Sequence, residues 1–233
     1  RRGGHPDGIR DLGREFSVLK MLDGSGLAPS PVMFDEDQNF IVYEYLPGVV
    51  WSRNMLTEAG TLEALADSLV RLHRNNPPGT VCDPIKALEH YLRNADPVLR
   101  SRLMEIAIAA VDRLHSRRLV LCHHDMWCGN IIQACGTRFI DWEFANGGAP
   151  LMDLATLVCY HGLDEDETEA LGCSYAGKLQ QQPHREDLGT WCTIVDCLTV
   201  AWSQFSIAHG ENAQVTEPFY GLAAKRLGLN IEN

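Results

Sequence analysis

The chain has 233 residues, of which 45% are hydrophobic and 22% are charged, as in ordinary folded globular proteins. Its 20 Lys and Arg residues against 31 Asp and Glu residues give a formal net charge of -11. Such a surface repels phosphate backbones, so we expect no nucleic-acid partner. No apolar run approaches the roughly 18 to 20 residues that a membrane span needs, so we expect no membrane partner. The acidic excess either serves solubility or attracts a small organic cation.

The eight cysteines favour neither a disulfide scaffold nor a zinc site. They include no Cys-x-x-Cys pair, and several lie in apolar segments such as 119–122, where cysteine acts as a small hydrophobic side chain. This usage is typical of a reducing compartment, so we expect a cytoplasmic location. The chain begins with Arg1 rather than Met, so we also expect the gene product to begin upstream of it.

The beginning of the chain predicts one helix and one hairpin. Apolar residues at helical spacing predict a helix from about Asp7 to Leu22: Ile9, Leu12, Phe16 and Leu19. Two extended stretches follow at 31–34 and 40–45, separated by a polar turn, and they predict a β-hairpin. The Leu-Pro-Gly run at 46–48 then ends the second strand.

The rest of the chain is predicted to be mainly helical. One apolar helix face starts at Thr61. Asp83 and Asp96 are each followed by proline, which is typical of an N-cap with proline at the first helical position. A late helix carries a single apolar stripe: Trp191, Ile194, Val195, Leu198, Ala201, Trp202 and Phe205.

Three short strands interrupt these helices, at 118–122, 131–132 and 138–140, the last two on either side of a turn at Gly136. The sequence therefore predicts an α+β fold of two lobes with a cleft at their join. The small strand-containing lobe is expected at 1–47, and the larger helical lobe at 48–233.

The polar loop between the first two of these strands carries the most specific pattern in the chain. His123, Asp125 and Asn130 have the spacing His-x-Asp-x-x-x-x-Asn, and Asp141 follows 11 residues after Asn130. Taken singly, these residues are turn formers and strand-end caps. Two motifs in this order, with a hairpin between them and an apolar strand before each, favour the catalytic and metal loops of a kinase.

On these motifs the sequence resembles the aminoglycoside phosphotransferase and choline kinase family of small-molecule kinases, with the bacterial thiamine kinases as the nearest branch. The runs at 45–48, 69–73, 87–92 and 141–145 carry the resemblance to that branch, and the last of them also resembles bacterial choline kinases. The resemblance implies a protein-kinase-like fold whose N-terminal nucleotide-binding lobe is incomplete here. It also implies ATP and Mg²⁺ as cofactors.

The family resemblance implies a role for each residue of the two loops. In phosphoryl transfer, the protein mainly positions the reacting groups and neutralises their charge. Asp125 would orient the attacking hydroxyl and accept its proton, whereas Asn130 and Asp141 would hold Mg²⁺. His123 would support the loop by hydrogen bonds to its backbone. Asp153 would cap the following helix and fix the catalytic loop.

The resemblance also implies a nucleotide site in the small lobe. Glu15 on the first helix would pair with a cationic phosphate anchor, either Arg2 or Arg1, although a solvent-facing Glu15 is the alternative. The carbonyl of Glu44 and the N–H of Leu46 would receive the adenine, although this segment is also typical of a plain edge strand. The glycine-rich loop that the family places before the anchor strand is absent from these residues.

The acceptor is the least specific inference, because kinases of this class differ mainly in the helical lobe. Glu143 is expected to face the acceptor, and Trp202 and Trp191 to form an aromatic wall for a cationic nitrogen, with hydrophobic core as the alternative for both tryptophans. We expect a small cationic alcohol, with thiamine first and choline or ethanolamine next. The residues also leave open an aminoglycoside kinase, supported only by the acidic run 164–167, and a nucleotide-binding pseudokinase. The sequence does not determine the oligomeric state.

Overall fold

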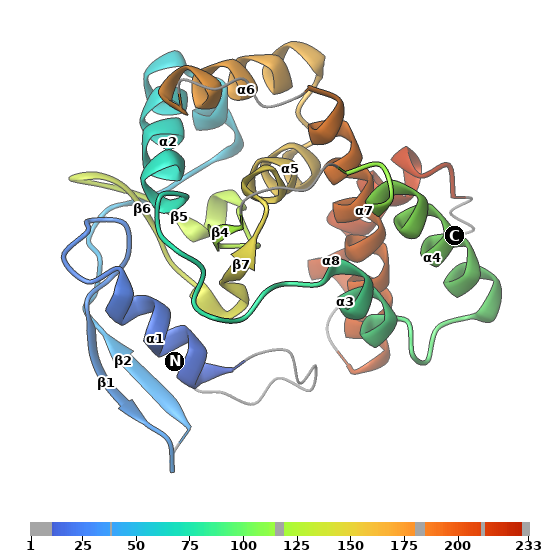
Figure 1. The fold of residues 1–233 in the computed structure, drawn as a ribbon, viewed down its shortest axis with the longest axis horizontal. Helices are drawn as coiled ribbons and strands as arrows, with labels where there is room; N and C mark the ends of the chain where they lie inside the picture. The colour runs from blue at the N-terminus through green and yellow to red at the C-terminus, as the bar shows by residue number, and fades with distance from the viewer. Residues whose placement is uncertain (1–10, 38, 115–118, 180–184, 211–212, 230–233) are drawn as a thin grey trace.

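The computed structural model describes residues 11–37, 39–114, 119–179, 185–210 and 213–229. The small part contains α1 (Leu12–Met21), β1 (Pro31–Asp35) and β2 (Phe40–Tyr43). The two strands pair antiparallel, with Phe34 opposite Ile41, and α1 lies beside them (Figure 1). The predicted hairpin is therefore confirmed. The boundary between residues 47 and 48 stays a prediction.

The first helix begins later than the sequence predicted. Asp11 has extended backbone angles, with φ -131° and ψ 106°, and its side chain accepts a hydrogen bond from the N–H of Arg14 at 3.0 Å. Asp11 is therefore the N-cap of α1, and the helix starts at Leu12 rather than near Asp7. The expected residues before Asp11, including Ile9, lie outside the described residues.

The larger part is built mainly from helices. They are η1 (Arg53–Leu56), α2 (Ala59–Leu72), α3 (Pro84–Tyr91), α4 (Pro97–Val111), α5 (Pro150–His161), α6 (Glu165–Leu179), α7 (Arg185–Ala208) and α8 (Ala213–Arg226). Both predicted aspartate caps are confirmed. Asp83 accepts from the N–H of Ile85 at 3.1 Å, and Asp96 accepts from the N–H of Val98 at 3.0 Å.

Short strands and 3₁₀ turns connect these helices. They are β3 (Val49–Val50), β4 (Val120–Cys122), η2 (Cys128–Asn130), β5 (Ile131–Ala134), β6 (Gly136–Phe139), η3 (Trp142–Phe144) and β7 (Asn146–Gly148). One sheet has the order β3-β5-β6, and β4 pairs antiparallel with β7. Gly136, expected in a turn, is the first residue of β6 and pairs with Ala134. Cys122 at the end of β4 pairs with Asn146 at the start of β7, so the segment that follows β4 lies next to the segment that precedes β7.

The hydrophobic core of the larger part forms around α5 and α7. Helix α7 packs against α5 and α8 and also contacts α3 and α4, which gather on the same side of the molecule (Figure 1). The predicted stripe on α7 is largely buried, and Ile194, Val195 and Ala201 are at most 2% exposed. The eight cysteines are free thiols. Within the described ranges, no helix is long and apolar enough to cross a membrane.

Candidate active site

Asp153 on α5 holds the beginning of the catalytic loop. Its carboxylate is fully buried and accepts the backbone N–H of His123 at 2.9 Å and that of His124 at 2.7 Å. The expectation that Asp153 fixes this loop is therefore confirmed. The expectation that it caps its own helix is wrong, because the N-cap of α5 is Ala149, one residue before Pro150.

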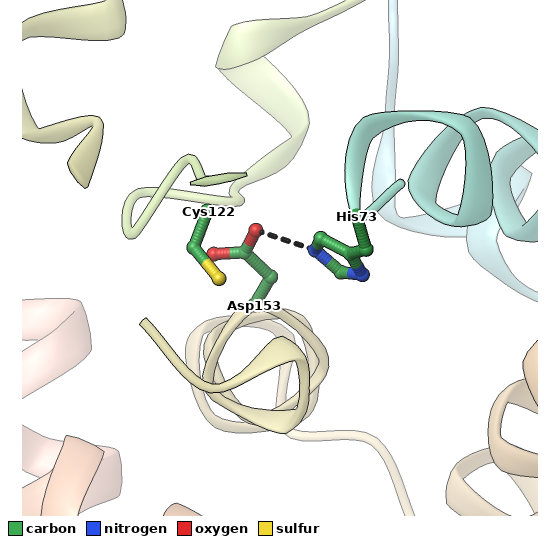
Figure 2. Close-up of side chains that lie close together, drawn as sticks. All are labelled: His73, Cys122 and Asp153. Carbon is green, nitrogen blue, oxygen red and sulfur yellow. Dashed lines mark hydrogen bonds and ion pairs between the residues drawn. The ribbon is translucent and has the colours of Figure 1, made fainter. Parts of the chain in front are cut away.

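A third hydrogen bond joins Asp153 to α2. His73 Nε2 lies 3.0 Å from Asp153 Oδ2, and His73 Nδ1 lies 2.7 Å from the hydroxyl of Tyr175 on α6. Figure 2 shows Asp153 between His73 and Cys122, with the bond to His73 dashed. Burial alone would raise the pKa of Asp153, but His73 and the N–H of His123 outweigh it and lower the pKa to about 2. The carboxylate therefore stays ionised.

The same three side chains have the residue types of a metal-ligand set. One ligand atom from each of His73, Cys122 and Asp153 lies within 4.8 Å of the other two. Burial raises the pKa of the Cys122 thiol well above its ordinary value, whereas metal binding requires a thiolate. Both oxygens of Asp153 already accept hydrogen bonds. We therefore interpret His73 and Asp153 as a hydrogen-bond network that supports the loop, with Cys122 as a buried neighbour.

His123 links the catalytic loop to the segment that carries Asp141. Its Nε2 lies 2.9 Å from the carbonyl oxygen of Ile140, which can only accept, so Nε2 carries the proton. Its Nδ1 then accepts the N–H of Asp125 at 3.3 Å. Burial lowers the pKa of His123, which keeps the ring neutral. This geometry matches a supporting role better than that of a base.

Asp125 and Asn130 meet across the loop. Asn130 Nδ2 donates to Asp125 Oδ2 at 2.8 Å and to the carbonyl oxygen of Asp125 at 2.9 Å. The N–H of Ile140 donates to the carbonyl oxygen of Asn130 at 2.9 Å, so the next residue, Asp141, begins beside Asn130. The fold thus brings the two predicted motifs to one place.

Both loops contain a residue with left-handed backbone angles. Asp141 has φ 66° and ψ 64°, and His124, next to Asp125, has φ 65°. Such angles cost a residue other than glycine on the order of 1 kcal/mol, and strain of this kind is concentrated at functional sites. The angles at Asp141 turn the chain sharply from β6 into η3.

The residues expected to hold Mg²⁺ fit that ion chemically. Asn130 donates both of its hydrogen bonds to Asp125 through its nitrogen, which leaves Oδ1 as the atom suited to bind a cation. Asp141 adds a carboxylate. Magnesium prefers such oxygen ligands and commonly keeps several waters, so a pair of protein ligands is sufficient.

A cavity of about 830 Å³ lies beside Asp125. Glu143, which is 6% exposed, contributes to its wall, as does Trp202. Further aromatic side chains in the wall come from separate parts of the chain: Tyr91, Trp127, Phe144, Tyr160 and Phe219. The ring of Phe219 lies edge-on to those of Trp127 and Tyr160, with centroids 6.1 Å and 5.4 Å away. The described wall therefore combines six Phe, Tyr and Trp side chains with the carboxylates of Asp83, Asp125 and Glu143 and the basic side chains of Arg14 and Lys86.

The structure separates the two tryptophans that the sequence placed in one wall. Trp202 lines the cavity and also packs against the core between α3, α4 and α7. Trp191 is 7% exposed and belongs to the main hydrophobic core, so its expected place in the wall is wrong. The two residues are 11 apart on α7, which is close to three helical turns, so they lie on the same face of the helix. They nevertheless contact different hydrophobic clusters.

Sequence reasoning missed most of the aromatic wall. Trp127 had a usable signal, because it lies two residues after Asp125 in the predicted loop, and Tyr91 and Phe144 lie in runs that carry the family resemblance. A Cβ atom on Gly129 would lie 2.1 Å from the Trp127 ring, so the glycine lets this tryptophan fold back over the loop. Tyr160 and Phe219 had no such signal, because helix packing alone brings them to the cavity.

The structure tests some of the predictions made for the nucleotide site. Glu15 is 1% exposed, so the solvent-facing alternative is wrong. Its expected partners Arg2 and Arg1 lie outside the described residues. The N–H of Glu44 donates to the carbonyl of Ser30 at 2.9 Å, as expected of an edge strand. Adenine binding by the Glu44 carbonyl and the Leu46 N–H stays a prediction.

Comparison with known proteins decides the family. The model of the phosphotransferase enzyme family, APH, matches residues 4–188. The chain belongs to this family. Thiamine kinase of Shigella boydii is 30% identical over 149 residues, which are 62% of this chain and 51% of that protein. Thiamine kinase of an Escherichia coli strain is 31% identical over 200 residues, 82% of this chain and 68% of that protein. In the first of these matches, the phosphotransferase chain spans about half the length of its relative.

Solved structures share the fold of this phosphotransferase chain. Choline kinase from Streptococcus pneumoniae has a TM-score of 0.83 at 20% identity, covering 98% of this chain and 84% of that one. A macrolide 2'-phosphotransferase from Brachybacterium faecium has a TM-score of 0.66 at 21% identity, covering 100% and 84%. These likenesses confirm the α+β, protein-kinase-like fold with a small strand-containing part and a larger helical part.

Proposed function

We propose that this chain is part of an ATP-dependent kinase that phosphorylates a hydroxyl group of a small organic cation, with thiamine as the first candidate. The observation that carries the proposal is the Asp125–Asn130 pair at the edge of a cavity whose wall contains six aromatic side chains. Similarity to thiamine kinases supports the choice of acceptor. Membership of the phosphotransferase family supports the use of ATP.

In this proposal Asp125 acts on the acceptor hydroxyl. It lines the cavity, and its Oδ2 receives a hydrogen bond from Asn130 that fixes the carboxylate. A carboxylate held in this way orients the hydroxyl towards the phosphoryl group and accepts its proton as the new bond forms. His123 keeps the backbone of Asp125 in place and takes no part in proton transfer.

Asn130 and Asp141 are the residues proposed to hold Mg²⁺. The ion, when bound, would neutralise the charge of the transferred phosphoryl group. The chain contributes the positions of the two oxygen ligands, through the hydrogen bond between Ile140 and Asn130 and the left-handed turn at Asp141. The proposed nucleotide contacts are those expected of Arg2, Glu15, Glu44 and Leu46.

The cavity wall supports a cationic acceptor. Aromatic faces attract organic cations, and the contribution per contact is about 0.5 to 2 kcal/mol. The three carboxylates at the same wall, Asp83, Asp125 and Glu143, outnumber its two basic side chains, Arg14 and Lys86, and add attraction for a cation. A volume of about 830 Å³ is within the usual range for small-molecule sites and leaves room for an acceptor with rings. Choline and ethanolamine are the second candidates.

The aminoglycoside alternative loses the acidic run that supported it. Asp164 and Glu167 cap each other at the start of α6: the N–H of Glu167 donates to Asp164 at 2.9 Å, and the N–H of Asp164 to Glu167 at 3.0 Å. Glu167 also pairs with Arg53 at 2.5 Å. None of these residues lines the described wall of the cavity. The run is thus a helix start with reciprocal capping.

A panel of acceptors tests the proposal. ATP consumption is measured with thiamine, choline, ethanolamine and kanamycin, and the phosphorylated product is identified by mass. We expect turnover with thiamine above that with the other three, and none in the Asp125→Ala variant. Binding of ATP with no turnover for any acceptor would favour the pseudokinase alternative, and a preference for kanamycin would overturn the choice of a small cation.

A further inference from the structure

His161, the last residue of α5, is bound to the middle of the catalytic loop. The backbone N–H of Cys128 donates to His161 Nε2 at 3.0 Å. Cys128 lies three residues after Asp125 and two before Asn130. The hydrogen bond therefore holds the loop between its two functional side chains, at a point that the contacts of Asp153 and His123 do not reach.

The N–H of Cys128 needs an acceptor from outside the loop. Cys128 is the first residue of η2, and N–H groups at the start of a helix have no acceptor within it. The N-cap residue is Trp127, whose indole nitrogen donates and cannot accept. Cys128 is only 6% exposed, so water is a poor substitute. His161 thus caps η2 in place of an N-cap side chain.

The hydrogen bond of His161 Nδ1 fixes Nε2 as an acceptor. Its Nδ1 lies 3.0 Å from the carbonyl oxygen of Leu157, one turn earlier on α5. Because a carbonyl only accepts, Nδ1 carries the proton, and Nε2 is the acceptor that Cys128 requires. Burial and the charge of Arg53 lower the pKa of His161 despite the Leu157 carbonyl, which favours the neutral ring.

The end of α5 is itself held by a neighbouring element. Arg53 Nε donates to the carbonyl oxygen of His161 at 2.9 Å, and the same guanidinium pairs with Glu167 at the start of α6. Gly162 follows with φ 56° and ends the helix directly after the histidine. These contacts therefore hold His161 in place, and its hydrogen bond to Cys128 in turn holds the loop.

We infer that His161 is a positioning residue of the phosphotransferase, which sets the relative placement of Asp125 and Asn130 by capping η2. The inference rests on the proposed roles of these two residues. His161 does not contribute to the described wall of the cavity. Its removal should therefore slow the chemical step and leave the binding of ATP and of the acceptor almost unchanged.

The first test compares two variants of His161, and a control variant, by steady-state kinetics with the best acceptor of the panel. His161→Leu should lower kcat roughly tenfold to a hundredfold, because small displacements of catalytic groups have effects of this size. The KM values for ATP and the acceptor should change by less than about twofold. His161→Gln, whose amide oxygen accepts from Cys128, should keep kcat within about threefold of the unmodified protein.

The chain offers a matched control at the end of α7. His209 also precedes a glycine with positive φ, Gly210 at 90°, and its Nδ1 lies 2.7 Å from the carbonyl of Phe205, one turn earlier. His209→Leu removes the same contact within a helix but no contact with the catalytic loop. Its kcat should stay unchanged. An equal loss in His209→Leu and His161→Leu would show a general effect of helix ends and would overturn the inference.

Cys128→Pro gives a second, independent test, because proline has no N–H and is favourable at the first helical position. In that background His161→Leu should change kcat by less than about twofold, since the hydrogen bond is already absent. The same loss in both backgrounds would overturn the inference. If Asp125→Ala keeps its turnover, the proposed function fails; if Asp125→Ala is inactive and His161→Leu is fully active, only the role of His161 fails.

Discussion

The side-chain nitrogen of Asn130 lies 2.8 Å from Oδ2 of Asp125 and donates a hydrogen bond to it. One side chain thus spans five residues of the loop and fixes the carboxylate that faces the cavity. The two polar atoms of the Asn130 amide therefore have different roles. The nitrogen orients Asp125, and the oxygen is the atom suited to a cation.

Asp125→Ala and Asp141→Ala should each abolish turnover, with a loss of about a thousandfold or more, because the first removes the proposed base for the acceptor hydroxyl and the second a proposed Mg²⁺ ligand. Neither side chain belongs to the hydrophobic core. Circular dichroism and the melting temperature should therefore stay close to those of the unmodified protein. Near-normal turnover in either variant would contradict the assigned roles.

Asp153→Ala should destabilise the protein by about 3 to 5 kcal/mol, the range for removing one partner of a buried ionic network. It leaves the N–H groups of His123 and His124 without their acceptor. The free energy of unfolding is measured in urea. Asp96→Ala is the control, since it removes an exposed helix cap and should cost only about 1 kcal/mol. Equal losses in the two variants would contradict the prediction.

Glu143→Gln and Trp202→Ala should raise the KM for the acceptor more than the KM for ATP. Loss of a cation–π contact is expected to cost about 0.5 to 2 kcal/mol, or roughly a twofold to thirtyfold weakening. Trp191→Phe, in the core and outside the cavity wall, should lower stability without changing either KM. If the acceptor KM is unchanged in the first two variants, the wall does not recognise the cation.

Stability should fall as the pH drops below about 6.5. Burial lowers the pKa of His123, His124 and His161 below the ordinary value of 6.5. As the pH falls, the unfolded chain therefore binds protons before the folded protein does, which favours unfolding. Between its unfolded and folded pKa values, each ring contributes up to about 1.4 kcal/mol per pH unit. Urea unfolding at pH 7.5, 6.5 and 5.5 measures this dependence.

His161→Gln provides the comparison for the pH series, because it removes one of these titrating rings while keeping the acceptor. Its free energy of unfolding should decline less steeply between pH 6.5 and 5.5. Asp153, with a pKa lowered to about 2, loses its contribution only below pH 4 or so. An equal free energy of unfolding at pH 7.5 and 5.5 in the unmodified protein would contradict the burial of neutral histidines.

Local patterns in the sequence were sufficient for the hairpin, for several helices and for the two loops, but not for the short strands β3 and β7. Asp-Pro pairs mark the starts of α3 and α4 because an aspartate cap and a proline act within one turn. The spacing of Asp125, Asn130 and Asp141 is readable because a short hairpin connects the two loops in the chain. The start of α1 was predicted too early, because apolar spacing alone does not show which residue caps the helix, and the cap is Asp11.

What the sequence by itself determined is therefore the fold class, the spacing of the two loop motifs and the order of the elements that carry them. Only the tertiary structure decided which side chains surround those motifs. Tyr160 and Phe219 join Trp202 at the cavity, Trp191 goes to the core, and His161 reaches Cys128. These contacts join residues on different elements, and they depend on the angles at which α5, α7 and α8 pack. No local periodicity encodes those angles, because they result from the fit of many side chains at once.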